Sequence, residues 1–196
     1  MQKIIAITGG IGSGKSVVSA ILKNMGYQVY DSDVEARMLM DNSDSIKASI
    51  QEAFGKSLVN KGIIDRKRLS EIVFSDKDKL QELNNIVHGA VIKHFIEWSK
   101  NIGDSVVFIE TAILYESGLN KYVTDIWEVV APENIRIERV MNRNHISEVE
   151  VKRRIESQNK HYEDIVNSGH RIIHNDDESA LMPQIIYLLD KVHKSL

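Results

Sequence analysis

Short runs of apolar residues alternate along this chain with longer stretches that carry apolar positions at helical spacing. Residues 3–8 form a β-branched run that is too short for a helix and ends at a glycine, which predicts a strand buried on both faces. Residues 16–25 then have the pattern of a helix. The same reasoning predicts further short strands at residues 27–30, 106–109, 126–130 and 171–174.

The stretch between the second and third predicted strands has a different pattern. From residue 34 to about residue 101, apolar residues recur three or four positions apart, and no convincing strand pattern occurs. The apolar sets include Ile46/Ile50/Phe54, Leu69/Ile72/Val73, Leu80/Leu83/Ile86/Val87 and Val91/Ile92/Phe95/Ile96. We therefore predict a helical insertion of roughly seventy residues in this part of the chain.

Helical patterns also separate the later strands. One helix is predicted at residues 133–143, another from residue 147 to about residue 159, and a final one at residues 179–192. Ser147 and Glu150 have the spacing of a capping box, which marks a helix start. Strands separated by helices indicate an α/β fold with a five-stranded, mainly parallel sheet, because each return to a parallel strand needs a crossover.

A glycine-rich segment joins the first predicted strand to the first predicted helix. Its sequence, Gly9-Gly-Ile-Gly-Ser-Gly-Lys-Ser16, satisfies the P-loop pattern G-x-x-x-x-G-K-[S/T] in the context that the pattern requires. Glycines let the backbone fold back so that successive N–H groups point at phosphate oxygens, beside the positive end of a helix. The alternative is a glycine-rich turn without function. We predict a P-loop NTPase core that binds ATP.

Individual residues of this segment have distinct expected roles. Lys15 can reach the β- and γ-phosphates as a point charge, and the Ser16 hydroxyl is placed to bind Mg²⁺. The Val17 N–H group lies in the first helical turn, beside the α-phosphate. The predicted ATP-binding residues are Gly12, Ser13, Gly14, Lys15, Ser16 and Val17. Lys15 is also a predicted catalytic residue.

Acidic residues follow two of the predicted strands. Asp31 and Asp33 lie where the second strand leaves the sheet, which is where α/β proteins bind ligands. We predict that Asp33 accepts the proton of an acceptor hydroxyl; the alternative is that these residues only cap the following helix. Glu110 and Glu116 follow the third strand and are either Mg²⁺ ligands or solvated charges, so they stay outside the catalytic set.

Arginines are concentrated between residues 136 and 154. Kinases commonly close an arginine-bearing lid over the polyphosphate during transfer, where guanidinium groups spread negative charge. Arg143 is the first catalytic candidate and Arg139 the second. The alternative is that these arginines form surface ion pairs with glutamates one helical turn away. The complete set is Arg136, Arg139, Arg143, Arg153 and Arg154.

Composition narrows the class of protein. The chain has 196 residues, 42% of them hydrophobic, and a formal net charge of −3, which is typical of a globular protein and argues against nucleic-acid binding. No segment approaches the ~18 apolar residues of a membrane span. The absence of cysteine excludes disulfides and fits a reducing compartment, so we expect a cytoplasmic protein. The oligomeric state is left open.

The histidines do not indicate a zinc site. His88, His161 and His174 lack the i, i+4 spacing of paired ligands on one helix. We interpret them as surface or packing residues.

With these residues in view, the chain resembles the dephospho-CoA kinase family over nearly its whole length. The likeness begins with residues 8–16 and the segment Asp31-Ser-Asp33-Val-Glu-Ala-Arg37, a pair that is more specific than the loop alone. Further matches are Phe54-Gly55, residues 62–69, Val73-Phe74, His88, Leu114-Tyr-Glu116, Arg139-Val-Met-Asn-Arg143, Gln158 and Asn175. Departures are Val17 for the usual Thr, Gly89 for a common Pro, Glu110-Thr-Ala112 for Asp-x-Pro, and Arg136 for a common Gln.

The resemblance implies transfer of the ATP γ-phosphoryl group to the ribose 3′-hydroxyl of dephospho-CoA, the last step of coenzyme A synthesis, with Asp33 matching the family's proposed base. It also implies three parts. These are a three-layer P-loop core (residues 1–33, 104–133 and 168–196), a helical substrate-binding lobe (residues 34–103) and a lid (residues 134–167).

Other functions remain as alternatives. Another small-molecule or nucleoside monophosphate kinase would share the core fold, because fold alone does not fix the substrate. A nucleotide-dependent switch is disfavoured by the arginine-rich segment and by the absence of an Asn-Lys-x-Asp guanine motif. A pure binding module would not require Lys15, Ser16 and Asp33 together.

Overall fold

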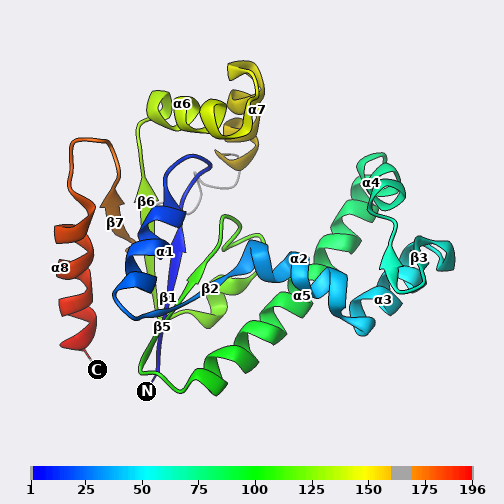
Figure 1. The fold of residues 1–196 in the computed structure, drawn as a ribbon, viewed down its shortest axis with the longest axis horizontal. Coiled ribbons are helices and arrows are strands. Elements are labelled where there is room, and N and C mark those ends of the chain that lie inside the picture. Colours follow the sequence, from blue (N-terminus) through cyan, green and yellow to red (C-terminus); the bar gives the residue numbers. More distant parts are fainter. Residues whose placement is uncertain (1, 160–168, 196) are drawn as a thin grey trace. The chain divides into compact units, whose positions relative to one another are not determined.

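A five-stranded sheet forms the centre of the fold in the computed structural model, which describes residues 2–159 and 169–195 (Figure 1). The strands are β1 (Lys3–Thr8), β2 (Gln28–Asp31), β5 (Val106–Glu110), β6 (Asp125–Val130) and β7 (Arg171–His174), in the order β2-β5-β1-β6-β7. The pairings of β1 with β5, β1 with β6 and β6 with β7 are parallel. The predicted α/β class and five-stranded sheet are confirmed.

The central position of β1 explains its apolar sequence. It lies between β5 and β6, and Ile5, Ala6 and Ile7 have no exposed surface. Both faces of this strand are therefore buried, as its unbroken β-branched run predicts. Phe108 on β5 and Trp127 on β6 pack edge to face beside it, with ring centroids 5.1 Å apart.

Helices pack against this sheet and connect its strands along the chain. Helix α1 (Lys15–Asn24) packs against β1 and β5, and α8 (Leu181–His193) packs against β7 and α1. A short 3₁₀ helix, η2 (Leu119–Tyr122), precedes β6. Beyond β6, α6 (Glu133–Asn144) and α7 (Glu148–Asn159) form a hairpin with its own apolar cluster. The buried residues of that cluster are Ile137, Val140, Val151 and Ile155.

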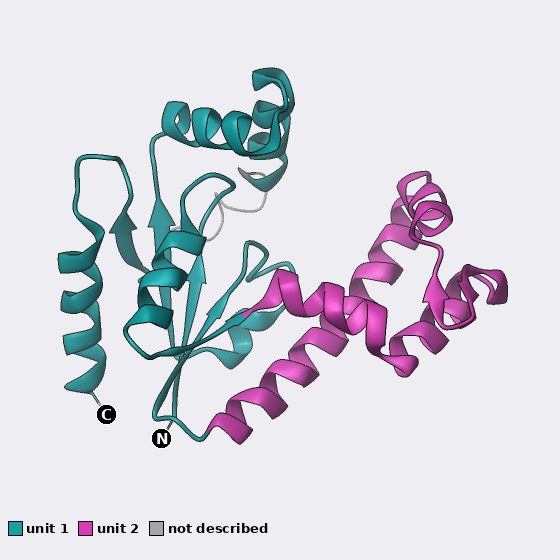
Figure 2. Ribbon diagram, viewed as in Figure 1, with its two compact units in different colours: residues 1–30, 103–196 teal, residues 31–102 magenta. Residues whose placement is uncertain are grey.

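The chain divides into two compact units, which Figure 2 shows in different colours. One comprises Met1–Tyr30 and Gly103–Leu196, and the other, here called the helical lobe, comprises Asp31–Ile102. In the lobe, α2 (Ser32–Asn42), α3 (Asp44–Phe54) and α4 (Arg66–Phe74) pack against the long helix α5 (Lys77–Ile102). Its buried apolar cluster is Ile46, Ile50, Leu58, Ile64, Leu69 and Val73.

The helical lobe differs from the prediction in two details. A 3₁₀ turn, η1 (Lys56–Leu58), leads into a small hairpin of β3 (Val59–Asn60) and β4 (Ile63–Ile64), so the expectation of no strand here was wrong. Lys61 and Gly62 turn the hairpin with φ of 49° and 77°, as a two-residue primed turn requires.

The second detail is the length of α5. Two separate apolar patterns, at residues 80–87 and 91–96, belong to one 26-residue helix, because Gly89 between them does not interrupt it. Nowhere in the part of the chain that the structure describes is a helix both long and apolar enough to cross a membrane.

The predicted helix start at Ser147 is supported by one hydrogen bond. The Ser147 hydroxyl accepts a hydrogen bond from the N–H of Glu150 at 3.3 Å, which is the bond that the first residue of a capping box makes. The last part of the predicted lid, residues 160–167, and His161 lie outside the described residues. His174 is exposed, as expected.

Candidate active site

The glycine-rich segment lies between β1 and α1, where the motif predicts it. Lys15 turns back over the loop, and its Nζ donates hydrogen bonds to the carbonyl oxygens of Gly9 at 2.8 Å and Gly10 at 3.3 Å. The ammonium group is therefore held next to the loop backbone, where it can exchange these carbonyls for phosphate oxygens.

Among the described residues, the N-terminus of α1 has no side-chain cap, like those of α6 and α8, whereas three helices of the helical lobe have one. Asp31, Ser43 and Asp65 cap α2, α3 and α4 with side-chain oxygens. In the described chain, no side chain caps α1, and its first turn contains no acidic residue. Together with the glycine-rich loop, the helix dipole and the N–H groups of this turn are suited to an anion from outside the chain.

Gly14 is the N-terminal flanking residue of α1 and requires glycine for two reasons. Its φ of +94° is in the region that side chains disfavour. A Cβ atom there would also overlap the side-chain amide of Asn175. Val17 is exposed in the same turn, and its N–H donates to the Gly14 carbonyl at 3.0 Å.

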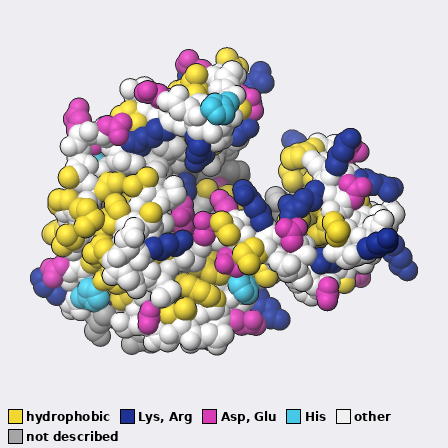
Figure 3. All heavy atoms as spheres, in the orientation of Figure 1, with side chains coloured by type: hydrophobic (Ala, Val, Ile, Leu, Met, Phe, Trp, Pro, Cys, Tyr) yellow, Lys and Arg dark blue, Asp and Glu magenta, His cyan; other side chains and the backbone are white. Residues whose placement is uncertain are grey.

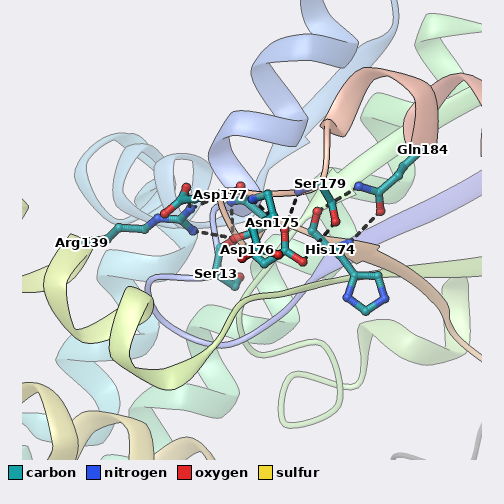
Figure 4. A network of polar contacts seen from close by, with 9 residues as sticks. Ser13, Arg139, His174, Asn175, Asp176, Asp177, Ser179 and Gln184 are labelled. Atoms are coloured by element: carbon teal, nitrogen blue, oxygen red, sulfur yellow. Dashed lines mark hydrogen bonds and ion pairs between the residues drawn. The ribbon is translucent and has the colours of Figure 1, made fainter.

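Asn175 ties the loop to the end of β7 (Figure 4). Its side-chain Nδ2 donates to the carbonyl oxygen of Ser13 at 2.8 Å, and its backbone N–H donates to Val130 at 2.8 Å. Strands β1, β6 and β7 are parallel, so the segments that follow them meet at one edge of the sheet. The sequence singled out Asn175 only as a family match, because its bond to Ser13 spans 162 positions.

Arg139 reaches this network from α6. Its Nη1 donates to the Asn175 carbonyl at 3.1 Å, and its Nη2 pairs with the Asp177 carboxylate (Figure 4). The Arg139 side chain is 28% exposed. Of the predicted catalytic arginines, Arg139 is thus linked to the P-loop through Asn175, which bonds to Ser13.

The loop that carries Asp177 is shaped by its neighbour Asp176. The Asp176 carboxylate accepts hydrogen bonds from the N–H groups of Ser179 at 2.7 Å and Glu178 at 3.1 Å. These bonds, with that from Ser179 first, hold the pKa of the Asp176 carboxyl below its usual value.

The other arginines are placed differently. Arg143 is exposed near the end of α6, and its Nε donates to the side chain of Asn144 at 2.9 Å. It does not take part in the Asn175 network among the described contacts. Arg154 pairs with Glu150 at 2.8 Å on the surface of α7, which is the alternative expected for such arginines. Arg136 and Gln158 contact the loop at Ile11.

Asp31 and Asp33 have separate tasks at the start of the helical lobe. The Asp31 carboxylate accepts bonds from the N–H groups of Asp33 at 3.1 Å and Val34 at 3.0 Å. Asp31 alone therefore caps α2, and the exposed carboxylate of Asp33 is left for other chemistry. The capping interpretation therefore holds for Asp31, and the role of Asp33 as proton acceptor stays a prediction.

The side chains near the P-loop suit a Mg²⁺ ion that binds together with a nucleotide. Across residues 2–159 and 169–195, no three acidic or histidine side chains gather into a cluster that could hold a metal by itself. Ser16 is an exposed residue in the first turn of α1. Mg²⁺ usually keeps several waters and takes few protein oxygens beside substrate phosphates, so one hydroxyl here suits it.

Sequence comparisons with known proteins indicate one family. The sequence model of the family described as dephospho-CoA kinase matches residues 3–180. A dephospho-CoA kinase of Porphyromonas gingivalis is 38% identical over 188 residues, which cover 96% of this chain and 93% of that protein.

Two solved structures share the fold over the full chain. TT1252 from Thermus thermophilus has a TM-score of 0.80 and 31% identity, and covers 100% of this chain and 98% of its own. The dephospho-CoA kinase from Campylobacter jejuni has a TM-score of 0.69 and 24% identity, with coverage of 100% and 99%.

Proposed function

This chain belongs to the dephospho-CoA kinase family, and we infer that it transfers the γ-phosphoryl group of ATP to the ribose 3′-hydroxyl of dephospho-CoA, giving coenzyme A and ADP. This reaction is the last step of coenzyme A biosynthesis. The observation that carries the inference is the P-loop that opens into the uncapped N-terminus of α1, within a family match that spans residues 3–180.

The donor half of the reaction uses the loop network. The N–H groups of the loop and of the first turn of α1 receive the phosphates of ATP through Gly12, Ser13, Gly14, Lys15, Ser16 and Val17. Lys15 releases the carbonyls of Gly9 and Gly10 and binds the β- and γ-phosphates. Asn175 and Arg139 keep the loop in place from outside.

The transfer step needs a proton acceptor and a source of positive charge. The acceptor oxygen forms a bond to the γ-phosphorus, the bond to the β–γ bridging oxygen breaks, and ADP leaves. Asp33 takes the hydroxyl proton as that bond forms, because its carboxylate is not used to cap α2. Arg143 and Arg139 stabilise the negative charge that develops on the phosphoryl oxygens.

Mg²⁺ accompanies ATP in this proposal. The Ser16 hydroxyl would be its protein ligand. When bound, the ion neutralises charge on the β- and γ-phosphates.

The helical lobe supplies the acceptor site in this proposal. The sequence match to the family continues through it, and Asp33 lies in the first turn of its first helix. We place the reaction in the cytoplasm, which the lack of cysteine supports.

A panel of acceptors tests the function. ADP release is measured with ATP and Mg²⁺ plus dephospho-CoA, AMP, CMP, adenosine or no acceptor. We expect turnover with dephospho-CoA alone and a product that co-migrates with coenzyme A. Turnover on a nucleoside monophosphate without turnover on dephospho-CoA would instead support the alternative, another small-molecule kinase of the P-loop class.

A further inference from the structure

At the tip of the P-loop, Ile11 is bonded to both helices of the α6–α7 hairpin. The Ile11 N–H donates to Oε1 of Gln158 on α7 at 2.8 Å, and the Ile11 carbonyl accepts from Nε of Arg136 on α6 at 2.9 Å. Its side chain packs against the apolar cluster inside the same hairpin. Both polar groups of the Ile11 backbone and its side chain are thus anchored by two helices far along the sequence.

The hydrogen bond from the Ile11 N–H to Gln158 does not serve phosphate binding directly. A P-loop amide serves an anion by pointing into the loop. The Ile11 N–H instead meets a neutral amide oxygen that lies 147 positions away, so this group contributes to fixing the loop backbone. The Arg136 bond fixes the following peptide from the other side.

Two glycines of the loop make this close approach possible. A Cβ atom on Gly12 would lie 2.6 Å from the backbone carbonyl oxygen of Arg136, closer than real Cβ contacts come. A Cβ atom on Gly10 would overlap the Arg136 guanidinium. These glycines therefore admit helix α6 as well as phosphate, which gives the glycine pattern a second physical cause.

We propose that Gln158 and Arg136 are positioning residues that clamp Ile11, so that the α6–α7 hairpin sets the nucleotide affinity of the P-loop before any acceptor binds. Neither residue needs to touch ATP for this effect. The proposal rests on the proposed kinase function only in taking ATP as the nucleotide. It predicts that loss of either bond weakens ATP binding and leaves acceptor recognition unchanged.

The first test removes the acceptor of the Ile11 N–H. Gln158→Met keeps the length of the side chain and deletes its oxygen, and Glu156→Gln, at an exposed position of the same helix, is the matched control. Binding of β,γ-imido-ATP with Mg²⁺ is measured by calorimetry without any acceptor. We expect Gln158→Met to raise the dissociation constant about 3- to 10-fold, as loss of one hydrogen bond does. The control should bind like the wild type.

The second test separates a hydrogen bond from a charge at residue 136. Arg136→Met removes both, whereas Arg136→Gln keeps an N–H donor at the position of Nε and removes the charge together with the two terminal guanidinium nitrogens. If the clamp accounts for the role of Arg136, nucleotide affinity falls in Arg136→Met and is largely restored in Arg136→Gln. Equal losses in both would contradict the proposal, because they would mean that the charge itself acts on phosphate.

A double-mutant cycle and the kinetics complete the design. Because both residues hold Ile11, the combined loss in Gln158→Met/Arg136→Met should be smaller than the product of the single losses. The KM for dephospho-CoA should stay unchanged in both single variants. Unchanged nucleotide affinity in Gln158→Met overturns the proposal, whether or not its melting temperature falls. Should that variant fail to fold, the Arg136 pair decides.

These outcomes are distinct from failure of the proposed function. If the wild-type protein binds the ATP analogue but does not phosphorylate dephospho-CoA, the proposed function is wrong. The proposal about Ile11 is then still tested by the nucleotide affinities of the variants. A wild-type protein that does not bind the analogue would overturn both.

Discussion

The core unit and the helical lobe use their polar side chains in different ways. In the core unit, Asn175, Arg136 and Gln158 come from three segments and bond to the backbone of one loop. In the lobe, the described polar contacts include helix caps such as Asp65 and exposed pairs such as Arg66 with Asp41 at 2.7 Å. The first pattern organises a binding loop, whereas the second stabilises the lobe's own helices.

The surface of the lobe carries both apolar and charged side chains. Phe74, at the end of α4, is 77% exposed, and Ile63, on β4, is 73% exposed. Basic and acidic side chains are spread over the same unit (Figure 3). The P-loop is thus organised by contacts within one unit, and the lobe is stabilised by contacts of its own.

The largest expected effect comes from the loop lysine. Lys15→Ala should lower kcat by about 10²–10³-fold or more, because the variant loses a donor to the charge that develops on the transferred group. Lys23→Ala, at an exposed position in the last turn of the same helix, is the control and should retain wild-type turnover. ADP release under saturating ATP measures both. More than a tenth of normal activity in Lys15→Ala would contradict the assigned role.

Asp33 tests whether an acid of the lobe takes part in the chemistry. Asp33→Asn should lower kcat by about 10²–10⁴-fold with little change in ATP affinity, because proton acceptance matters only as the acceptor attacks. Asp44→Asn, an exposed residue in the first turn of α3, is the matched control. Near-normal turnover in Asp33→Asn would refute its role as the base.

The two candidate arginines should differ in what they change. Arg143→Ala should lower kcat by about 10-fold to 10²-fold without changing ATP affinity, because Arg143 is exposed and is assigned to the transition state alone. Arg139→Ala should also weaken ATP binding, since Arg139 holds Asn175 against the loop. Arg154→Ala is the control. If Arg139→Ala and Arg143→Ala change kcat and ATP affinity in the same way, the two arginines do not have the different roles assigned to them.

The smallest effect concerns the loop at Asp176. Its folded-state pKa is lowered, so its carboxylate contributes stability above the unfolded pKa of about 3.9, and this contribution is lost as the pH falls through the folded value. Asp176→Asn should therefore melt slightly below the wild type at pH 7, and the difference should shrink as the pH falls below the unfolded pKa. A difference that stays the same size from pH 7 down to pH 3 would contradict this cause.

Local patterns predicted much of the core unit. The strand at β1, the P-loop and the helix that follows it are each encoded within a few consecutive residues, and the structure has them there. The strand order could not be predicted, because it depends on which parallel crossovers pack side by side. The β3–β4 hairpin was missed because two-residue strands show no alternation.

The candidate site shows the same limit. Lys15, Ser16 and Asp33 stand out by motif and position, but the roles of Asn175 and Gln158 depend on contacts with residues 162 and 147 positions away. From the sequence, Arg143 ranks before Arg139 as a catalytic candidate, and only the contacts of α6 show that Arg139 is the one bonded to Asn175. Long-range side-chain contacts leave no periodic signal that a single sequence could reveal.

The most direct test of the account is the position that receives the phosphoryl group. Purified protein is incubated with ATP, Mg²⁺ and dephospho-CoA, or with its 2′-deoxy or 3′-deoxy ribose analogue, and the products are identified by mass and chromatography. The account predicts coenzyme A from dephospho-CoA, a phosphorylated product from the 2′-deoxy analogue and none from the 3′-deoxy analogue. Phosphorylation of the 3′-deoxy analogue, or no product from dephospho-CoA, would contradict it.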